Sequence, residues 1–395
     1  MKLLLSAPFL NGNEWKYIQD CLDTGWVSSV GKYVSLFEQQ VADFVGAKYG
    51  IACVNGTAAL HISLKLAGVE AGDYVILPNV TFIASANAIK YLGANPLLID
   101  ACEATWQMDL DILAAFLEKK TFIDAAGNCR LLENKQKIAA MMPVHVLGNM
   151  GDMRQLLAIS EKYKLPIVED ATEALGSTFG GKYAGTFGKL GCFSFNGNKI
   201  MTTGGGGVIV TDDEVLAKRA KHLTTQAKSH KTEYIHDEIG YNYRLVNILA
   251  ALGVAQLEQL PHFLERKAAI SAFYNEELAP IKGIIFQAVL PEVQENHWLY
   301  TFRHPQAHQL LQALNAQGIE ARPLWLPMNQ LTMFQQDIFV SEKNVSDILY
   351  KTCVSIPCSV NITREEQAYV VAQIFADLTA DFRRFNRRFS QMKSI

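Results

Sequence analysis

The sequence lacks the marks of a disulfide-rich, zinc-knuckle or membrane-spanning protein. Its 395 residues include seven cysteines, an odd number, and no two of them form a CxxC pair. A disulfide framework or a zinc knuckle needs paired cysteines, so we expect reduced thiols and a cytoplasmic location. No apolar run approaches the ~20 residues that cross a bilayer, and we therefore expect no membrane partner.

Strong charge of one sign is also absent. The formal net charge is -3, from 36 lysines and arginines against 39 aspartates and glutamates. This balance excludes a basic footprint along the whole chain, so we expect no nucleic-acid partner and only local binding of phosphate. The basic end, "RRFNRRFSQMKSI", is interpreted as the solvated face of a helix. The opening "MKLLLSAPFL" lacks the small-residue cleavage pattern of a secretion signal.

The composition is that of a globular protein with a large core, since 49% of the residues are hydrophobic and 19% are charged. Between residues 50 and 215, short apolar runs alternate with amphipathic stretches of helix length. The apolar runs are "GIACV", "YVILP", "PLLID", "IAAMMPVHV", "LPIVED", "CFSF" and "GVIVTDD". Continuous apolar strands of this kind are typical of a mostly parallel sheet with helices on both faces.

The pattern changes towards the C-terminus. Residues 214–260 are predicted to be helical, and "FLERKAAISAFYNEELA" continues the helical spacing. From about residue 280, the short runs "IIFQAVL" and "WLYTFRH" bracket the helical "AHQLLQALNAQG", and "EEQAYVVAQIFADLTADFRRF" is predicted as a last long helix. We predict a large α/β domain at 1–260, with an N-terminal helical segment, and a smaller α+β domain at 261–395.

Ligands of open parallel sheets collect where the strands end, so the residues after each strand are the candidates for a site. Gly56 and Thr57 follow "IACV" and would open a helix whose free amides suit a phosphate. On the local evidence alone, an ordinary strand-to-helix turn capped by Asn55 or Thr57 explains them better. Phe82 follows "YVILP" and is either a core residue or an aromatic that covers one face of a planar ring.

Acidic residues and one lysine follow the next strands. The stretch "EDATEALGS" places Glu169, Asp170 and Glu173 at the end of a buried strand, where charges need a partner. Asp170 could pair with a protonated ring nitrogen or cap a following helix. Lys199 follows "CFSFNGN", and a lysine that is partly desolvated there would have a lowered pKa and could attack an aldehyde to form a Schiff base.

The combination is more specific than its parts. A phosphate-type turn, an aromatic, a strand-end acid and a lysine beside the glycine run Gly204–Gly207 follow one another at the ends of strands of one sheet. Pyridoxal phosphate (PLP) needs these four parts: an anion site, a face for its ring, an acid for its pyridine nitrogen and an amine for its aldehyde. The glycine run would let the backbone turn closely beneath the cofactor.

At this point the chain resembles the DegT-type nucleotide-sugar aminotransferases, which are PLP enzymes of fold type I. The resemblance covers nearly the whole chain and rests on the segments "GWVSSVGKYVSLFE", "NGTAALHISL", "VTFIASANAI", "PVHVLG", "VEDATEALGS", "SFNGNKIMTTGGGG" and "GYNYRLVNILAALGVAQL". It implies a large domain with a mostly parallel seven-stranded sheet covered by helices, followed by the smaller α+β domain.

The resemblance implies a role for each candidate around the ring. Lys199 would bond to the cofactor aldehyde and move the proton between the cofactor and the substrate carbon. Asp170 would hold the pyridine nitrogen protonated, and Phe82 would stack on the ring.

The resemblance also implies which residues bind the cofactor phosphate. Gly56, Thr57 and Ser194 would bind it within one chain, and Asn242 in "GYNYR" would complete the site from a neighbouring subunit. A homodimer with shared active sites follows from this assignment.

One position departs from the commonest family pattern. Many members have glutamine where this chain has Glu173, and glutamine can donate a hydrogen bond to the cofactor's phenolic oxygen whereas an ionised glutamate cannot. Glu173 would therefore face the sugar or be protonated. Together with "SFNGNKI" and "GIEARPLWLPMNQ", it is similar to the branch that makes UDP-4-amino-6-deoxy-N-acetylhexosamines in bacillosamine and legionaminic acid pathways.

Further residues are candidates for substrate contact, although surface charge or core packing explains them too. They are Ser28, Ser29, Lys32, Arg322 and Trp325. His145 is interpreted as a core histidine. No metal site is expected.

The implied activity is transfer of the amino group of L-glutamate to the 4-keto carbon of a UDP-linked 4-keto-6-deoxy-N-acetylhexosamine. Alternatives are a 3-keto sugar, a GDP- or TDP-linked sugar, a PLP-dependent sugar dehydratase, and a regulatory protein that has kept the fold. The dehydratases lack the Schiff-base lysine, so Lys199 argues against them.

Overall fold

The computed structural model describes residues 2–230 and 232–378. Its centre is formed by two four-stranded sheets whose facing edges meet. One sheet has the order β1 (Tyr49–Cys53), β11 (Gly207–Thr211), β10 (Leu190–Ser194), β7 (Val168–Asp170). The other has the order β6 (Ile138–Met141), β2 (Tyr74–Pro78), β3 (Asn95–Ile99), β15 (Ile338–Val340).

Two parallel bridges, Met141 with Ile167 and Val144 with Asp170, join β6 to β7 and make one layer of the two sheets. Strand β11 is antiparallel to both β1 and β10, whereas the other pairings in the layer are parallel. The predicted mostly parallel, seven-stranded sheet is confirmed. Strand β15 adds an eighth strand beyond β3, and it comes from the region that we assigned to the small domain.

Helices cover both faces, because alternate residues of each buried strand point to opposite sides. On one side, Ile76 and Leu97 pack with α2 (Lys32–Val45), α5 (Leu110–Lys120), α6 (Met153–Tyr163) and the first half of α8 (Asn247–Leu278). On the other side, Leu77 and Leu98 pack with α3 (Gly56–Leu66), α4 (Ala84–Tyr91) and α7 (Glu214–Thr224). Helix α1 (Glu14–Thr24) lies against α8.

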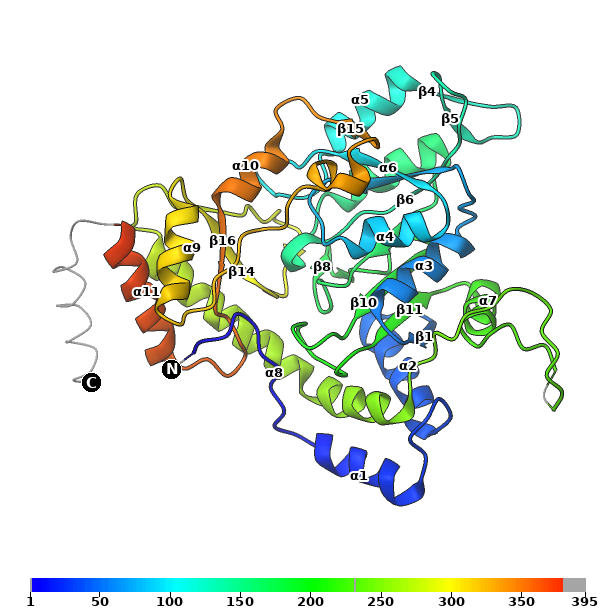
Figure 1. Ribbon diagram of the computed structural model, residues 1–395, viewed down its shortest axis with the longest axis horizontal. Helices are drawn as coiled ribbons and strands as arrows, with labels where there is room; N and C mark the ends of the chain where they lie inside the picture. Colours follow the sequence, from blue (N-terminus) through cyan, green and yellow to red (C-terminus); the bar gives the residue numbers. More distant parts are fainter. Residues whose placement is uncertain (1, 231, 379–395) are drawn as a thin grey trace.

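A second, smaller α+β region follows. Its antiparallel sheet has the order β12 (Ile285–Phe286), β14 (Tyr300–Arg303), β16 (Cys353–Ile356). Helices α9 (Ala307–Ala316), α10 (Val345–Thr352) and α11 (Arg364–Leu378) belong to it. A core around Phe302, Leu310 and Ile374 also takes in Tyr274 from the second half of α8. Figure 1 shows how α8 runs from α1 to these C-terminal elements.

The remaining elements are short. They are the strands β4 (Thr121–Ile123), β5 (Cys129–Leu131), β8 (Thr178–Phe179), β9 (Lys182–Tyr183) and β13 (Val293–Gln294), and the 3-10 turns η1 (Val146–Gly148), η2 (Met328–Gln330) and η3 (Thr332–Phe334).

The structure differs from the prediction between the helices of residues 214–260. Of residues 225–246, those that the structure describes (225–230 and 232–246) form no helix, because the chain leaves α7 at Thr224 and folds back as irregular segments before α8 begins. Helix α8 crosses position 261 without interruption, and residue 3 pairs with residue 319. The domain division at 260/261 stays a prediction. The basic end, residues 383–395, lies outside the described residues.

Within the described part of the chain, no helix combines the length and the apolarity needed to span a membrane. All seven cysteines are free, and Cys102 is the one that is partly exposed.

Asp100 ties the C-terminal region to the central sheet at the end of β3. Its buried carboxylate accepts hydrogen bonds from the amides of Val345 and Ser346, both at 2.8 Å, and from the hydroxyl of Ser341 at 2.6 Å. Replacing this acceptor would leave the first turn of α10 with buried, unsatisfied donors.

We therefore expect Asp100→Ala to lower the free energy of unfolding by about 3–5 kcal/mol, measured in a urea titration. The matched control is Asp213→Ala, which removes an exposed cap at the start of α7 and should cost about 1 kcal/mol. Equal losses in the two variants would show that Asp100 is an ordinary cap.

Candidate active site

A cavity of about 470 Å³ lies where strands β7 and β10 end. Most of the predicted site residues line it. They are Gly56, Thr57, Phe82, Asp170, Glu173, Ser194, Lys199, Arg322 and Trp325. The parallel part of the sheet places them together, because the carboxyl ends of its strands share one edge.

Lys199 lies in the turn after β10, and its side chain is only 12% exposed. Its Nζ is 4.1 Å from the centre of the Trp298 ring and 3.9 Å from Oε1 of Glu173. Burial lowers the pKa of the Lys199 amine, while the carboxylates of Glu173 and Asp170 oppose that change. The lysine is thus held inside the cavity rather than on the surface.

The indole of Trp298 also fixes the loop that carries the lysine. Its Nε1 donates a hydrogen bond of 2.7 Å to the carbonyl of Asn198, the residue before Lys199. Sequence reasoning missed Trp298, which comes from the segment before β14, a hundred residues away along the chain. No local pattern at residue 298 points to this contact.

Asp170 ends strand β7 and is 2% exposed. Its Oδ2 accepts a hydrogen bond of 2.7 Å from the hydroxyl of Ser85, and its Oδ1 accepts one of 3.2 Å from the amide of Thr172. No helix follows β7 in this described segment, so the alternative reading of Asp170 as a helix cap is wrong. Ser85, which follows Phe82 by three residues, was also missed.

Glu173 is buried in the wall of the cavity. Its Oε2 accepts a hydrogen bond of 2.8 Å from the amide of Leu147, whose positive φ of 64° within η1 accompanies this contact. Burial raises the pKa of Glu173 to about 7, and the Asp170 carboxylate adds to the increase while Lys199 and the Leu147 amide oppose it.

The start of α3 faces the cavity with Gly56 and Thr57. The side chain of Asn55 caps this helix by accepting a hydrogen bond of 2.8 Å from the amide of Ala58, so the expected cap is present beside the phosphate-type turn. A Cβ at position 56 would lie 2.8 Å from Cβ of Ser194, so glycine is needed where the helix meets β10.

The four glycines of the run Gly204–Gly207 have different surroundings. Gly205 and Gly206 line the cavity, and Gly204 has a positive φ of 80°. Gly207 already belongs to β11, and a Cβ there would lie 2.5 Å from the carbonyl oxygen of Asn55. Close approach of β11 to the start of α3 therefore explains the last glycine.

Phe82 is 52% exposed and borders the cavity, so the alternative of a core phenylalanine is wrong. Arg322 also borders the cavity and pairs with Glu320 at 2.9 Å. Trp325 packs partly into the core. His145 is buried, with Nε2 2.9 Å from Oε2 of Glu169, which confirms its interpretation as a core histidine.

Four of the predicted site residues, all within the described part of the chain, do not line this cavity. Asn242 is exposed and pairs by a bridge with Thr225. Lys32 pairs with Asp20 at 2.9 Å, and the loop before it carries the exposed Ser28 and the half-buried Ser29. Their assigned contacts stay predictions.

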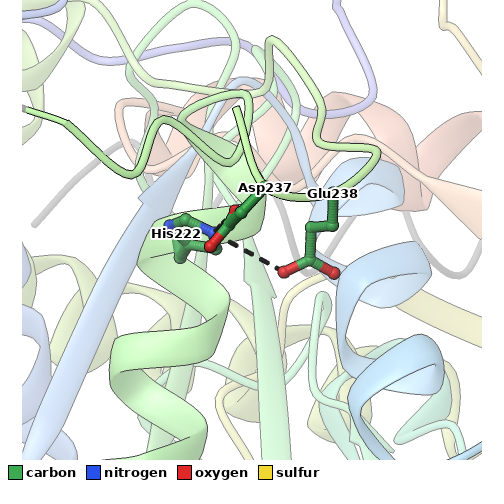
Figure 2. Close-up of side chains that lie close together, drawn as sticks. All are labelled: His222, Asp237 and Glu238. Atoms are coloured by element: carbon green, nitrogen blue, oxygen red, sulfur yellow. Dashed lines mark hydrogen bonds and ion pairs between the residues drawn. The ribbon is translucent and has the colours of Figure 1, made fainter. Parts of the chain in front are cut away.

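A cluster of possible metal ligands lies elsewhere, at the end of α7. Figure 2 shows His222 pointing towards Asp237 and Glu238, which come from the loop above the helix. His222 Nε2 is 2.7 Å from Asp237, and Arg219 binds both oxygens of Glu238. The guanidinium already neutralises one of the two acids, so the cluster is explained as a surface ion-pair network.

The donor set of the cavity fits PLP. The buried carboxylate of Asp170, which contacts no cationic side chain among the described residues, suits a protonated ring nitrogen, and the amine of Lys199 suits an aldehyde. The start of α3, where Gly56 and Thr57 line the cavity, and the hydroxyl of Ser194 suit a phosphate.

Comparison with known proteins shows which family the chain belongs to. Residues 8–375 match the DegT/DnrJ/EryC1/StrS aminotransferase family. The chain belongs to this family. As a member, it is an aminotransferase, and the aminotransferases of this family use PLP as cofactor.

Relatives within the DegT/DnrJ/EryC1/StrS family differ in the nucleotide sugar that they are named for. The chain is 35% identical over 379 residues to the GDP-perosamine synthase of Caulobacter vibrioides, covering 94% of this chain and 97% of the relative. It is 28% identical over 370 residues to the UDP-4-amino-4,6-dideoxy-N-acetyl-beta-L-altrosamine transaminase of Campylobacter jejuni, covering 92% and 93%.

A solved structure of a DegT DnrJ EryC1 StrS aminotransferase from Brucella abortus has the same fold. It superimposes with a TM-score of 0.84 at 25% identity and covers 93% of this chain and 95% of its own. The fold type I architecture is thus confirmed.

Proposed function

We propose that this aminotransferase moves the amino group of L-glutamate to the 4-keto carbon of a nucleotide-linked 4-keto-6-deoxyhexose. The proposal rests on one observation above the others. The amine of Lys199 lies inside a cavity whose wall also holds the buried carboxylate of Asp170, and Glu320 and residues 322–325 line the same cavity. The amine of Lys199, the carboxylate of Asp170 and space for a large substrate therefore lie in one cavity.

PLP, when bound, supplies an aldehyde that condenses with amines and a ring that accepts the electron pair left when a proton departs. Asp170 would hold the ring nitrogen in its protonated form, since its negative charge favours a neighbouring cation. Ser85 keeps that carboxylate in place by donating to Oδ2.

Lys199 would act as the base and acid that moves the substrate proton at its Nζ. Its lowered pKa raises the fraction of neutral amine, which is the form that accepts a proton. The Trp298 ring and the hydrogen bond to the Asn198 carbonyl limit the freedom of the lysine loop. Glutamate and the sugar would use the same lysine in turn, which gives ping-pong kinetics.

The first candidate for the sugar is a UDP-linked 4-keto-6-deoxy-N-acetylhexosamine. The branch that "SFNGNKI" and "GIEARPLWLPMNQ" resemble supports it, as does the relative from Campylobacter jejuni. The second candidate is a GDP-linked 4-keto-6-deoxyhexose, which is favoured by the higher identity to the GDP-perosamine synthase of Caulobacter vibrioides.

A panel of UDP-, GDP- and TDP-linked keto sugars tests this choice. We expect glutamate alone to bleach the absorption of the bound cofactor and one class of 4-keto sugar to restore it, with a kcat/KM at least about tenfold above the other classes. Failure of glutamate to change the spectrum would contradict amino transfer itself. Restoration only by a 3-keto sugar would contradict the position of the new amine.

We also propose a cytoplasmic homodimer in which Asn242 reaches the cofactor phosphate of the neighbouring subunit. The exposure of Asn242 and of the apolar Ile239 close by supports a contact with a second copy. The loop with Ser28, Ser29 and Lys32 would contact the substrate across the same interface.

A further inference from the structure

Helix α8 carries a buried lysine, Lys267, that the proposed mechanism does not use. Lys267 is only 2% exposed. Its Nζ donates hydrogen bonds of 2.6 Å to the carbonyl of Trp298 and of 2.8 Å to the carbonyl of Cys358, and it lies 3.4 Å from Sγ of Cys358. Lysine is seldom buried without a carboxylate, because its amine loses hydration. The two backbone carbonyls offset that loss, and both are thereby tied to α8.

Trp298 connects this buried lysine to the amine in the active site. The carbonyl of Trp298 accepts from Lys267, while the centre of its ring lies 4.1 Å from Nζ of Lys199. Its Nε1 also donates a hydrogen bond of 2.7 Å to the carbonyl of Asn198. Lys199 and Lys267 line one small cavity of about 10 Å³ as well. A shift of the Trp298 backbone would therefore be felt directly at the amine of Lys199.

The segment that carries Trp298 is not in a conformation that its own backbone favours. His297, the residue before Trp298, has a positive φ of 53°, which residues other than glycine rarely adopt. The amide of Trp298 donates a hydrogen bond of 2.9 Å to Oδ1 of Asn296, a contact within the same turn. Lys267 holds the carbonyl from a different element, α8. The position of the indole thus depends on contacts from outside the turn, among them the one from Lys267.

We propose that Lys267 is a positioning residue of the active site, which holds the carbonyl of Trp298 and so keeps the indole packed against the amine of Lys199. The indole then shields one side of that amine from water and limits its movement within the cavity. The inference rests on the proposed function, because it takes from there the role of Lys199 as the amine that reacts.

The competing explanation is that Lys267 only braces α8 against the C-terminal region. Tyr274, seven residues further along α8 and fully buried, makes such a brace. Its hydroxyl donates a hydrogen bond of 2.8 Å to the carbonyl of Pro357, the residue before Cys358. The two side chains thus tie the same helix to neighbouring carbonyls, and Lys267 differs by its second bond, to Trp298. A comparison of the two positions separates a positioning role from bracing.

The test measures how readily Lys199 reacts in the full chain after removal of the cofactor. A small acylating reagent modifies neutral amines, and mass spectrometry of the peptide that contains Lys199 gives the rate constant. This constant is taken at the high-pH plateau, where the amine is neutral in every variant, so that a change reports access and not charge. Lys267→Met keeps the length of the side chain but donates no hydrogen bond. We expect it to raise the plateau rate constant by at least about fivefold, because the loss of buried hydrogen bonds favours local opening.

Tyr274→Phe is the matched control, because it removes the neighbouring tie from α8 without touching the bond to Trp298. Its rate constant should stay within about twofold of the wild type. Lys267→Arg keeps donors for both carbonyls and should do the same. An unchanged rate in Lys267→Met, an equal rise in Tyr274→Phe, or an equal rise in Lys267→Arg would overturn the proposal. The labelling needs neither glutamate nor a sugar, so it can succeed where the amino-transfer assay fails, and the two hypotheses fail separately.

A second variant decides the case if Lys267→Met does not fold. Lys267→Gln keeps a polar group in the buried position, but its side chain ends one atom earlier, so its amide should fall short of the two carbonyls. The same rise in the labelling of Lys199 is expected. Labelling at the wild-type rate in a folded Lys267→Gln would overturn the proposal.

Discussion

Lys199→Ala is expected to lower kcat by at least about 10⁴-fold and to remove the covalent attachment of the cofactor. The physical reason is that no other lysine or arginine among the described residues that line the cavity lies beside Asp170 and Glu173; Arg322 is the other cation, and it pairs with Glu320. The measurement is single-turnover kinetics with glutamate, together with the absorption spectrum of the purified variant.

Lys199→Arg is the matched control for charge, because it keeps a cation in the cavity but cannot condense with an aldehyde. It should be as inactive as Lys199→Ala while binding PLP without a covalent bond. Turnover close to that of the wild type in either variant would refute the assigned role of Lys199.

Asp170→Asn should have the second-largest effect, a loss of about 10³-fold in kcat. The amide has the size of the carboxylate and can still bind the hydroxyl of Ser85, but it has no charge with which to favour a protonated ring nitrogen. The expected signs are a slower loss of the substrate proton, measured by stopped-flow absorption, and weaker binding of PLP.

Ser85→Ala separates the charge of Asp170 from its orientation. It removes the 2.7 Å hydrogen bond to Oδ2 and leaves the carboxylate in place, so we expect a loss within about tenfold. If Ser85→Ala were as inactive as Asp170→Asn, the hydrogen bond and not the charge would govern the reaction.

The sequence was sufficient for the parts of the site that follow from the strands. Asp170 ends β7 and Lys199 lies in the turn after β10, and the rule that ligands bind at the carboxyl ends of parallel strands predicts that the two lie in one site. The buried apolar runs likewise predicted the sheet and its two covered faces, since their pattern depends on local burial.

Contacts between distant segments could not be predicted in the same way. Trp298 lies beside Lys199, and β15 pairs with β3, only because the C-terminal third of the chain folds back onto the sheet. The prediction of helix was wrong for the irregular stretches 225–230 and 232–246, because their neighbours have strong helical spacing. A single sequence carries no local sign of such packing.

Glu173 shows a different limit. The sequence identified it as a departure from glutamine, but its surroundings depend on the distance to Lys199 and on the Leu147 amide, which comes from a turn 26 residues upstream. The role proposed for Asn242 cannot be tested in the structure of a single chain, because the phosphate site assigned to it belongs to a second copy.

The central claim is that Lys199 is the residue to which the cofactor becomes covalently attached. Reduction of the purified enzyme with borohydride, followed by proteolysis and mass spectrometry, tests it most directly. The account predicts one phosphopyridoxyl group on the peptide that contains Lys199 and none on that peptide from Lys199→Ala. Attachment to another lysine, or no attachment in a protein that still transfers amino groups, would contradict it.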